Sequence, residues 1–210
     1  MNASATPSRS AARTHKSPEE RRAEILSAAG RQFARDGYRA TDVQHIADAI
    51  GIGKGTVYRL FPTKEALFLA TVDGAVEALR VRLFAAVEPL DDPLEKIRAA
   101  VHAYLAFFEE QPEVVELFIQ ERAEFGEQHR AAYFARADED RADWFRLFDQ
   151  LREQGRMRAL DSEGAGEALG SMLFGTILAH RMRNSDQRLT ESAGDLLEIF
   201  LDGILTGERA

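Results

Sequence analysis

The chain has 210 residues, of which 45% are hydrophobic and 30% charged, so it can bury a core as one or two domains. It contains no cysteine, which excludes disulfides and thiolate chemistry. No apolar run reaches the roughly 18 residues that a membrane span needs, and the first residues lack the apolar stretch of a secretory signal. We therefore expect a cytoplasmic protein without membrane contact.

The net charge of −8 is distributed unevenly along the chain. Residues 1–70 hold 11 Lys/Arg and 7 Asp/Glu, for +4, whereas residues 71–210 hold 16 and 28, for −12. Chance clustering of surface charge is one interpretation. The other is a basic N-terminal part that meets an anion and an acidic body with a separate task.

Helix-capping patterns predict the elements in chain order. Residues 1–16 hold no acidic residue and no apolar period, so we expect a disordered basic tail. Ser17, Pro18 and Glu20 form a capping box that opens a helix ending at Gly37. Thr41 followed by Gln44 repeats the box. The further helices are expected at 42–50, 54–61, 63–87, 93–111, 113–125, 128–154, 163–183 and 190–206.

The chain is therefore predicted to be all-α, with about nine helices. No segment alternates apolar and polar residues with the β-branched enrichment of a strand. The histidines show no metal-ligand spacing, and the few serines lack the surroundings of a nucleophile. We therefore expect no metal, no cofactor and no enzymatic activity.

The stretch "GIGKGTVYRLFPTKEALF" allows two interpretations, a phosphate-binding loop or a helix that meets DNA. A phosphate loop needs Ser or Thr after Gly53-Lys54, but Gly55 stands there. A dinucleotide-binding loop fails because its third glycine would be Thr56. Two short helices, 42–50 and 54–61, joined by a tight turn instead indicate a helix-turn-helix.

The side chains of this segment suit DNA. Lys54 supplies a charge, Thr56 offers a hydroxyl and a methyl, and Tyr58 and Arg59 reach further. Lys64, in the first turn of the next helix, suits a phosphate. The alternative is a helix-turn-helix kept only for packing, but these polar side chains would have no role in it.

Residues 18–68 resemble the N-terminal domain of TetR (tetracycline-repressor) family transcriptional regulators. The matching stretches are "AAGRQF", "GYRAT", "IADAIG", "KGTVY" and "FPTKEAL". The resemblance covers about a quarter of the chain, and its combined motifs are specific. It implies a DNA-binding domain at 17–68 and a helical ligand-binding and dimerisation domain at 69–210.

The resemblance also assigns residues to DNA. It places Thr41 as helix cap at a phosphate, Tyr58 and Lys64 at the backbone, and the helix from Lys54 to Arg59 in the groove. The expected DNA-binding residues are Thr41, Gln44, Lys54, Gly55, Thr56, Tyr58, Arg59 and Lys64. Gly53 and Leu60 depart from the family pattern, so base preference does not transfer.

Charged residues inside the apolar stripes of the acidic body point to a ligand pocket or to internal ion pairs. One interpretation pairs Arg98 or Arg122 with Glu121 or Asp140. The other is an aromatic pocket whose unmatched acid receives a cationic or hydrogen-bonding ligand. If both acids face a cavity, a cationic ligand is favoured. The expected pocket residues are Arg98, Phe118, Glu121, Phe125, Asp140, Trp144 and Phe148.

The last two predicted helices carry wide apolar stripes. Two copies of such a helix pair could form a four-helix bundle, as the family resemblance implies. The alternative is packing of the same stripes within one chain. The expected interface residues are Leu169, Leu173, Ile177, His180, Leu197, Phe200, Leu201 and Ile204.

The resulting hypothesis is a homodimeric repressor that binds an inverted-repeat operator in double-stranded DNA and is released by an unknown small-molecule effector. One alternative is an all-α ligand-binding protein or enzyme whose helix-turn-helix does not read sequence. Another is a regulator that only oligomerises, with no cavity between the fifth and eighth helices.

Overall fold

The computed structural model describes residues 16–126, 130–183 and 185–206, so the predicted tail at 1–15 lies outside the described residues. This part of the chain is all-α, as predicted. The helices are α1 (Pro18–Asp36), α2 (Val43–Ala49), α3 (Lys54–Leu60), α4 (Lys64–Val87), α5 (Pro93–Glu110), α6 (Glu113–Phe125), α7 (Ala132–Glu139), α8 (Arg141–Glu153), α9 (Ser162–Met182), the 3-10 helix η1 (Leu189–Glu191) and α10 (Ser192–Ile204).

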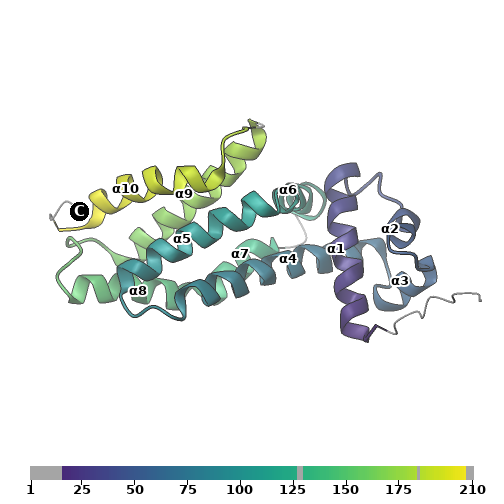
Figure 1. Ribbon diagram of the computed structural model, residues 1–210, viewed down its shortest axis with the longest axis horizontal. Helices are drawn as coiled ribbons and strands as arrows, with labels where there is room; N and C mark the ends of the chain where they lie inside the picture. The colour runs from purple at the N-terminus through teal and green to yellow at the C-terminus, as the bar shows by residue number, and fades with distance from the viewer. Residues whose placement is uncertain (1–15, 127–129, 184, 207–210) are drawn as a thin grey trace, which may run out of the picture.

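Figure 1 shows an elongated molecule with α1, α2 and α3 at one end, and we call these three helices the head. The remaining helices form the body, in which α5, α8, α9 and α10 lie toward the other end. The helix α4 starts beside the head and continues along the body. The buried side chains of both parts form one continuous hydrophobic cluster, so head and body share a core.

The first helix begins as predicted. The Ser17 hydroxyl accepts a hydrogen bond from the Glu20 backbone N–H at 3.1 Å, and the Glu20 carboxylate accepts one from the Ser17 N–H at 2.7 Å. These bonds satisfy N–H groups that have no partner within a helix. At the other end, Gly37 adopts a φ of 83°, which is accessible to glycine and strained for other residues.

The predicted cap of the second helix is wrong by one residue. Asp42 is the N-cap of α2, and its carboxylate accepts from the Gln44 N–H at 2.8 Å. The Thr41 side chain is only 3% exposed, and its hydroxyl donates to the Gly37 carbonyl at 2.8 Å. Both residue types are good caps, but here Thr41 closes the turn after α1, which leaves Asp42 to begin α2.

The single helix predicted at 128–154 is two helices. It is divided at Asp140, which ends α7 and begins α8 with φ −93° and ψ −1°. The Asp140 carboxylate accepts a hydrogen bond from Arg80 Nε on α4 at 2.7 Å, a contact that fixes the break. The described residues therefore hold ten α-helices, one more than predicted, and the short helix α7 has no fully buried residue.

Within the described residues there is no β-strand, only an isolated antiparallel bridge between Met157 and Leu205. Beside it, the Arg158 N–H donates to the Ile204 carbonyl at 2.8 Å. This bridge fastens the segment after α8 to the end of α10.

Glu109 on α5 forms hydrogen bonds with the segment between α9 and α10. Its carboxylate accepts from the Thr190 backbone N–H at 2.9 Å, from the Thr190 hydroxyl at 2.8 Å and from Arg188 Nε at 2.9 Å. These contacts, the Thr190 N–H above all, lower the pKa of Glu109 to about 2. Because they favour the ionised carboxylate, deprotonated Glu109 stabilises the folded chain.

Glu109→Gln is expected to lower the free energy of unfolding at pH 7 by about 1 to 2 kcal/mol. The carboxylate's contribution is complete above its ordinary pKa near 4.5 and disappears as the pH falls toward 2. Urea unfolding at several pH values should show wild type and variant converging at low pH. Glu198→Gln, at an exposed position on α10, is the control. A pH-independent difference would contradict the prediction.

Candidate functional site

Helices α2 and α3 form a compact helix-turn-helix. Gly51 turns the chain with a φ of 66°, and the Ile52 N–H donates to the Ala47 carbonyl at 3.0 Å. Ile46 and Val57 are completely buried. Because these apolar side chains hold the two helices against the head core, the opposite side of α3 faces solvent.

The solvent side of α3 presents the predicted groove residues. Tyr58 is 38% exposed, Arg59 is exposed, and Thr56 is half-buried. Lys54 Nζ lies 2.8 Å from the Asp42 carboxylate, and this hydrogen bond raises the pKa of Lys54. Arg59 forms no ion pair with any described residue. Its guanidinium is therefore available to a base edge or a phosphate.

Lys64 connects α4 to the loop between α1 and α2. Its ammonium donates to the carbonyls of Arg39 at 3.1 Å and Thr41 at 3.2 Å, and it lies 4.8 Å from the centre of the Tyr38 ring. The Gln44 amide donates to Asp48 at 2.7 Å. These predicted DNA residues thus also organise the head.

Two elements of the body hold the head. The Gln120 amide on α6 donates to the Phe33 carbonyl at 2.9 Å. The Phe125 ring lies 5.1 Å from Tyr38 and 5.7 Å from Phe68 on α4. The predicted pocket residue Phe125 therefore lies at the contact between head and body and is not among the residues that line the body cavity described next.

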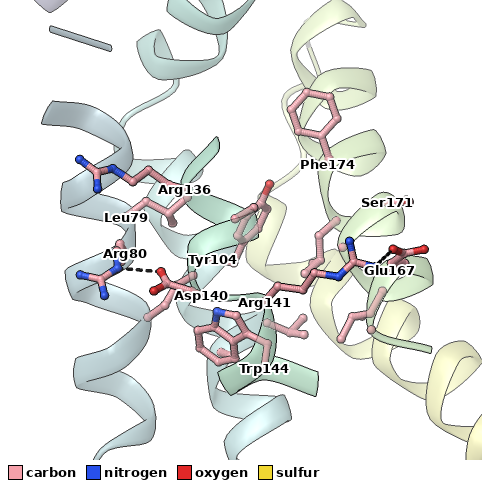
Figure 2. Close-up of a pocket in the computed structure, with 18 of the residues that line it drawn as sticks. Leu79, Arg80, Tyr104, Arg136, Asp140, Arg141, Trp144, Glu167, Ser171 and Phe174 are labelled. Atoms are coloured by element: carbon pink, nitrogen blue, oxygen red, sulfur yellow. Dashed lines mark hydrogen bonds and ion pairs between the residues drawn. The ribbon is translucent and has the colours of Figure 1, made fainter. Parts of the chain in front are cut away.

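The body contains a cavity of about 590 Å³ between α4, α5, α7, α8 and α9. Figure 2 shows side chains from these helices converging on it. Most of its lining is apolar, which suits a bulky apolar ligand. The aromatic side chains that line it are Phe84, Tyr104, Tyr133, Phe134, Trp144, Phe145, Phe148 and Phe174.

Three arginines line the cavity, each paired with acids. Arg80 Nε lies 2.7 Å from Asp140, and Arg141 pairs with Glu167, both drawn in Figure 2. Arg136 lies 3.3 Å from Asp73 on α4. These charges are therefore largely neutralised.

Three of the seven predicted pocket residues, Asp140, Trp144 and Phe148, line this cavity. The predicted ion pair of Asp140 exists, but with Arg80 instead of Arg98 or Arg122. Arg98 is not among the residues that line this cavity and lies 3.8 Å from Glu95.

The other buried acid is not part of the cavity wall either. Glu121 accepts a hydrogen bond from the Ala132 N–H at 3.0 Å, at the start of α7. Phe118 supports the wall from behind, with its ring 5.3 Å from that of Tyr133. Since only one of the two acids faces the cavity and that acid is paired, the condition for a cationic ligand is not met.

The sequence-based interpretation missed Arg80 and Tyr104. Arg80 lies on α4, where no single apolar stripe marks one face because different parts of the helix pack against α1, α5, α6 and α7. Tyr104 lies among apolar residues of α5 and is only 5% exposed, as an ordinary core aromatic would be. The position of Tyr104 among the apolar residues of α5 predicts that its side chain is buried, and a buried tyrosine hydroxyl needs a hydrogen-bond partner. This signal could have identified Tyr104.

The predicted dimer-interface residues pack inside the chain, which is the alternative stated for them. The seven apolar ones are buried in the core, and the half-buried His180 places Nε2 2.7 Å from the Gln187 carbonyl oxygen. Within the chain these stripes face α5 and α8, and the subunit interface remains a prediction. Apolar side chains turned outward on α9 and α10 include Met182, 72% exposed, and Ile199, 70% exposed.

Two kinds of site are absent from the described ranges 16–126, 130–183 and 185–206. No helix there is both long and apolar enough to cross a membrane. No three His, Asp or Glu side chains come together as metal ligands.

Comparisons with known proteins agree with this geometry. Residues 25–71 match the family model described as bacterial regulatory proteins, tetR family, and residues 90–178 match the tetracyclin repressor-like C-terminal domain. The HTH-type transcriptional repressor KstR2 of Mycobacterium tuberculosis is 31% identical over 139 residues, which are 66% of this chain and 70% of that protein.

Solved structures lead to the same family. The ketosteroid transcriptional regulator KstR2 of Mycobacterium tuberculosis superposes with a TM-score of 0.71 at 26% identity, over 91% of this chain and 98% of that one. The TetR family regulator PfmR of Thermus thermophilus gives 0.72 at 29% identity, over 85% and 97%. The chain therefore belongs to the TetR family: it is a DNA-binding transcriptional regulator and not an enzyme.

Proposed function

We propose that this regulator is a homodimeric repressor that leaves an inverted-repeat operator when a bulky, largely apolar molecule enters the body cavity. The observation that carries the proposal is the course of α4. The same helix holds the head through Lys64 and lines the cavity from Val76 to Phe84. In this proposal residues 17–68 read DNA, and residues 69–210 bind the effector and the second subunit.

The apolar lining supports the ligand class. The cavity is large enough for a fused-ring or long-chain molecule and offers few polar groups outside ion pairs. The relative KstR2 is a transcriptional repressor and a ketosteroid transcriptional regulator, which accords with a bulky apolar effector here. The regulator that only oligomerises is disfavoured, since it requires that no such cavity exist.

Effector entry is coupled to the head through ion pairs between α4 and the α7–α8 segment. Asp73 on α4 pairs with Arg136, and Arg80 on α4 pairs with Asp140. All but Asp73 line the cavity. A ligand that displaces α7 therefore acts directly on α4, and a shift of α4 changes the position of the head. The coupling is a change in the relative stability of two head spacings.

The operator is contacted by the exposed side of α3 and by the start of α4. Tyr58 and Lys64 are assigned to phosphates, where they set the position of the head. Thr56 and Arg59 are assigned to base edges in the major groove. The buried Thr41 hydroxyl is bonded within the head, so we assign that residue a supporting role.

The test of this function is selection of bound sequences from a random DNA pool, at low and at moderate salt. A dimeric reader is expected to recover an inverted repeat with half-sites about one helical turn apart. Recovery of unrelated sequences, with binding that collapses steeply as salt rises, would contradict sequence reading.

Variants of the head are expected to divide into two groups. Tyr58→Ala and Lys64→Ala should weaken binding to all sequences, and Lys64→Ala should also reduce the salt slope by about 1. Arg59→Ala and Thr56→Ala should change the selected sequence, with a loss of about 1 to 3 kcal/mol on the original operator for Arg59→Ala. Arg146→Ala, at an exposed position of α8, is the control. One consensus for all four variants would contradict the assignment.

The subunit interface is expected on the outward faces of α9 and α10. Ile199→Glu should shift the chain from dimer to monomer in sedimentation velocity, because a charge would be buried opposite its own copy across a two-fold axis. Val81→Glu changes an equally apolar residue on α4, 58% exposed, and should leave the dimer intact. A dimer unaffected by Ile199→Glu would place the interface elsewhere.

A further inference from the structure

Two tyrosine hydroxyls meet at the wall of the cavity. Tyr104 comes from α5 and Tyr133 from α7, and their oxygens lie 2.9 Å apart. Both residues line the cavity, and Figure 2 shows Tyr104 between the helix that carries Arg80 and the helix that carries Phe174. The two hydroxyls are thus polar groups in a mainly apolar cavity wall.

The hydrogen-bonding capacity of this pair is only partly used. Each phenol has one proton to donate, and a bond between the two hydroxyls uses one of the two protons. Neither hydroxyl has another hydrogen-bond partner among the residues that the structure describes. Burial raises the pKa of Tyr104 and of Tyr133, so both phenols stay protonated at neutral pH. One O–H donor at the cavity wall is therefore left over.

Neighbouring rings pack against the pair. The Tyr104 ring lies 4.9 Å from that of Phe108. The Tyr133 ring lies 5.3 Å from Phe118 and 5.0 Å from Phe174. These contacts direct both hydroxyls toward each other at the cavity wall, so a ligand meets the two polar groups at one place.

The charged groups around the cavity differ from this pair, because they have partners. Arg80 is bonded to Asp140, and Arg141 to Glu167. A ligand that used them would first have to break an ion pair. The tyrosine pair requires no such exchange, and an apolar surface against it would leave a buried donor unsatisfied.

We propose that Tyr104 and Tyr133 form a binding site for one uncharged acceptor oxygen, such as a ketone, ester or thioester carbonyl, on an otherwise apolar effector. This inference rests on the proposed effector role of the cavity and defines the ligand further. An anion is disfavoured here because two neutral phenols do not compensate a buried charge.

The test compares two ligands of the same shape. In 2-acetylnaphthalene a carbonyl oxygen stands where 2-isopropenylnaphthalene has a CH₂ group. Trp144, the single tryptophan of the chain, lines the cavity, so quenching of its fluorescence measures binding of both. Wild-type protein is expected to bind the ketone about tenfold more tightly. A third ligand, 2-naphthoate, should bind more weakly than the ketone.

The variants locate the donor. The double variant Tyr104→Phe/Tyr133→Phe keeps the shape of the wall and should bind ketone and alkene equally, with an alkene affinity no weaker than that of wild type because no donor is left unsatisfied. Each single variant keeps one hydroxyl, so the larger loss identifies the tyrosine that contacts the ligand. With a ¹³C-labelled carbonyl, the infrared band of the bound ketone should move to higher frequency in the double variant, because its hydrogen bond is lost.

Several outcomes would overturn the inference. Equal affinity of wild type for ketone and alkene, or tighter binding of naphthoate, contradicts the carbonyl site while leaving the cavity as an effector site. Persistence of the ketone preference in the double variant contradicts the assignment to these tyrosines. Failure of both neutral ligands to bind contradicts the proposed effector role of the cavity itself, and the tyrosine site with it.

Discussion

The structure depends on one constraint: the single helix α4 packs against both the head and the body. Near its start Phe68 is buried in the head, and further along Val76 and Leu79 are buried in the body. Since one rigid helix contributes to both ends of a continuous core, neither end can be repacked alone. The DNA-binding surface and the cavity wall are therefore mechanically linked by ordinary hydrophobic packing.

The head could be predicted almost completely from the sequence, because its signals are local. The capping box at Ser17, the glycine at Gly51 and the Thr63 cap each act within a few residues. The error at Thr41 is also instructive. Thr41 and Asp42 are both good caps, and a local hydrogen bond from the Thr41 hydroxyl to the Gly37 carbonyl leaves the cap position to Asp42.

The cavity could be predicted only in part, because its wall is assembled from five helices. The α8 stripe correctly indicated Trp144 and Phe148, since residues on one helix face tend to share surroundings. The spacing of apolar residues does not indicate which helix packs opposite. The sequence therefore suggests Arg98 or Arg122 as the partner of Asp140, whereas the partner is Arg80 on α4. For the same reason, a stripe does not tell whether it faces the chain's own core or a second subunit, and the apolar residues of the α9 and α10 stripes are buried within the chain.

The break at Asp140 makes one wall of the cavity different from the others. Helix α7 has no fully buried residue and is held to α4 by the ion pairs of Arg136 and Asp140. Dissolved salt screens such partly exposed pairs, whereas it leaves the hydrophobic packing of the other walls intact. Dissolved salt also weakens the contacts between basic side chains and DNA phosphates. We therefore expect rising ionic strength to weaken the ion pairs at this wall and the contacts to DNA phosphates in the same direction.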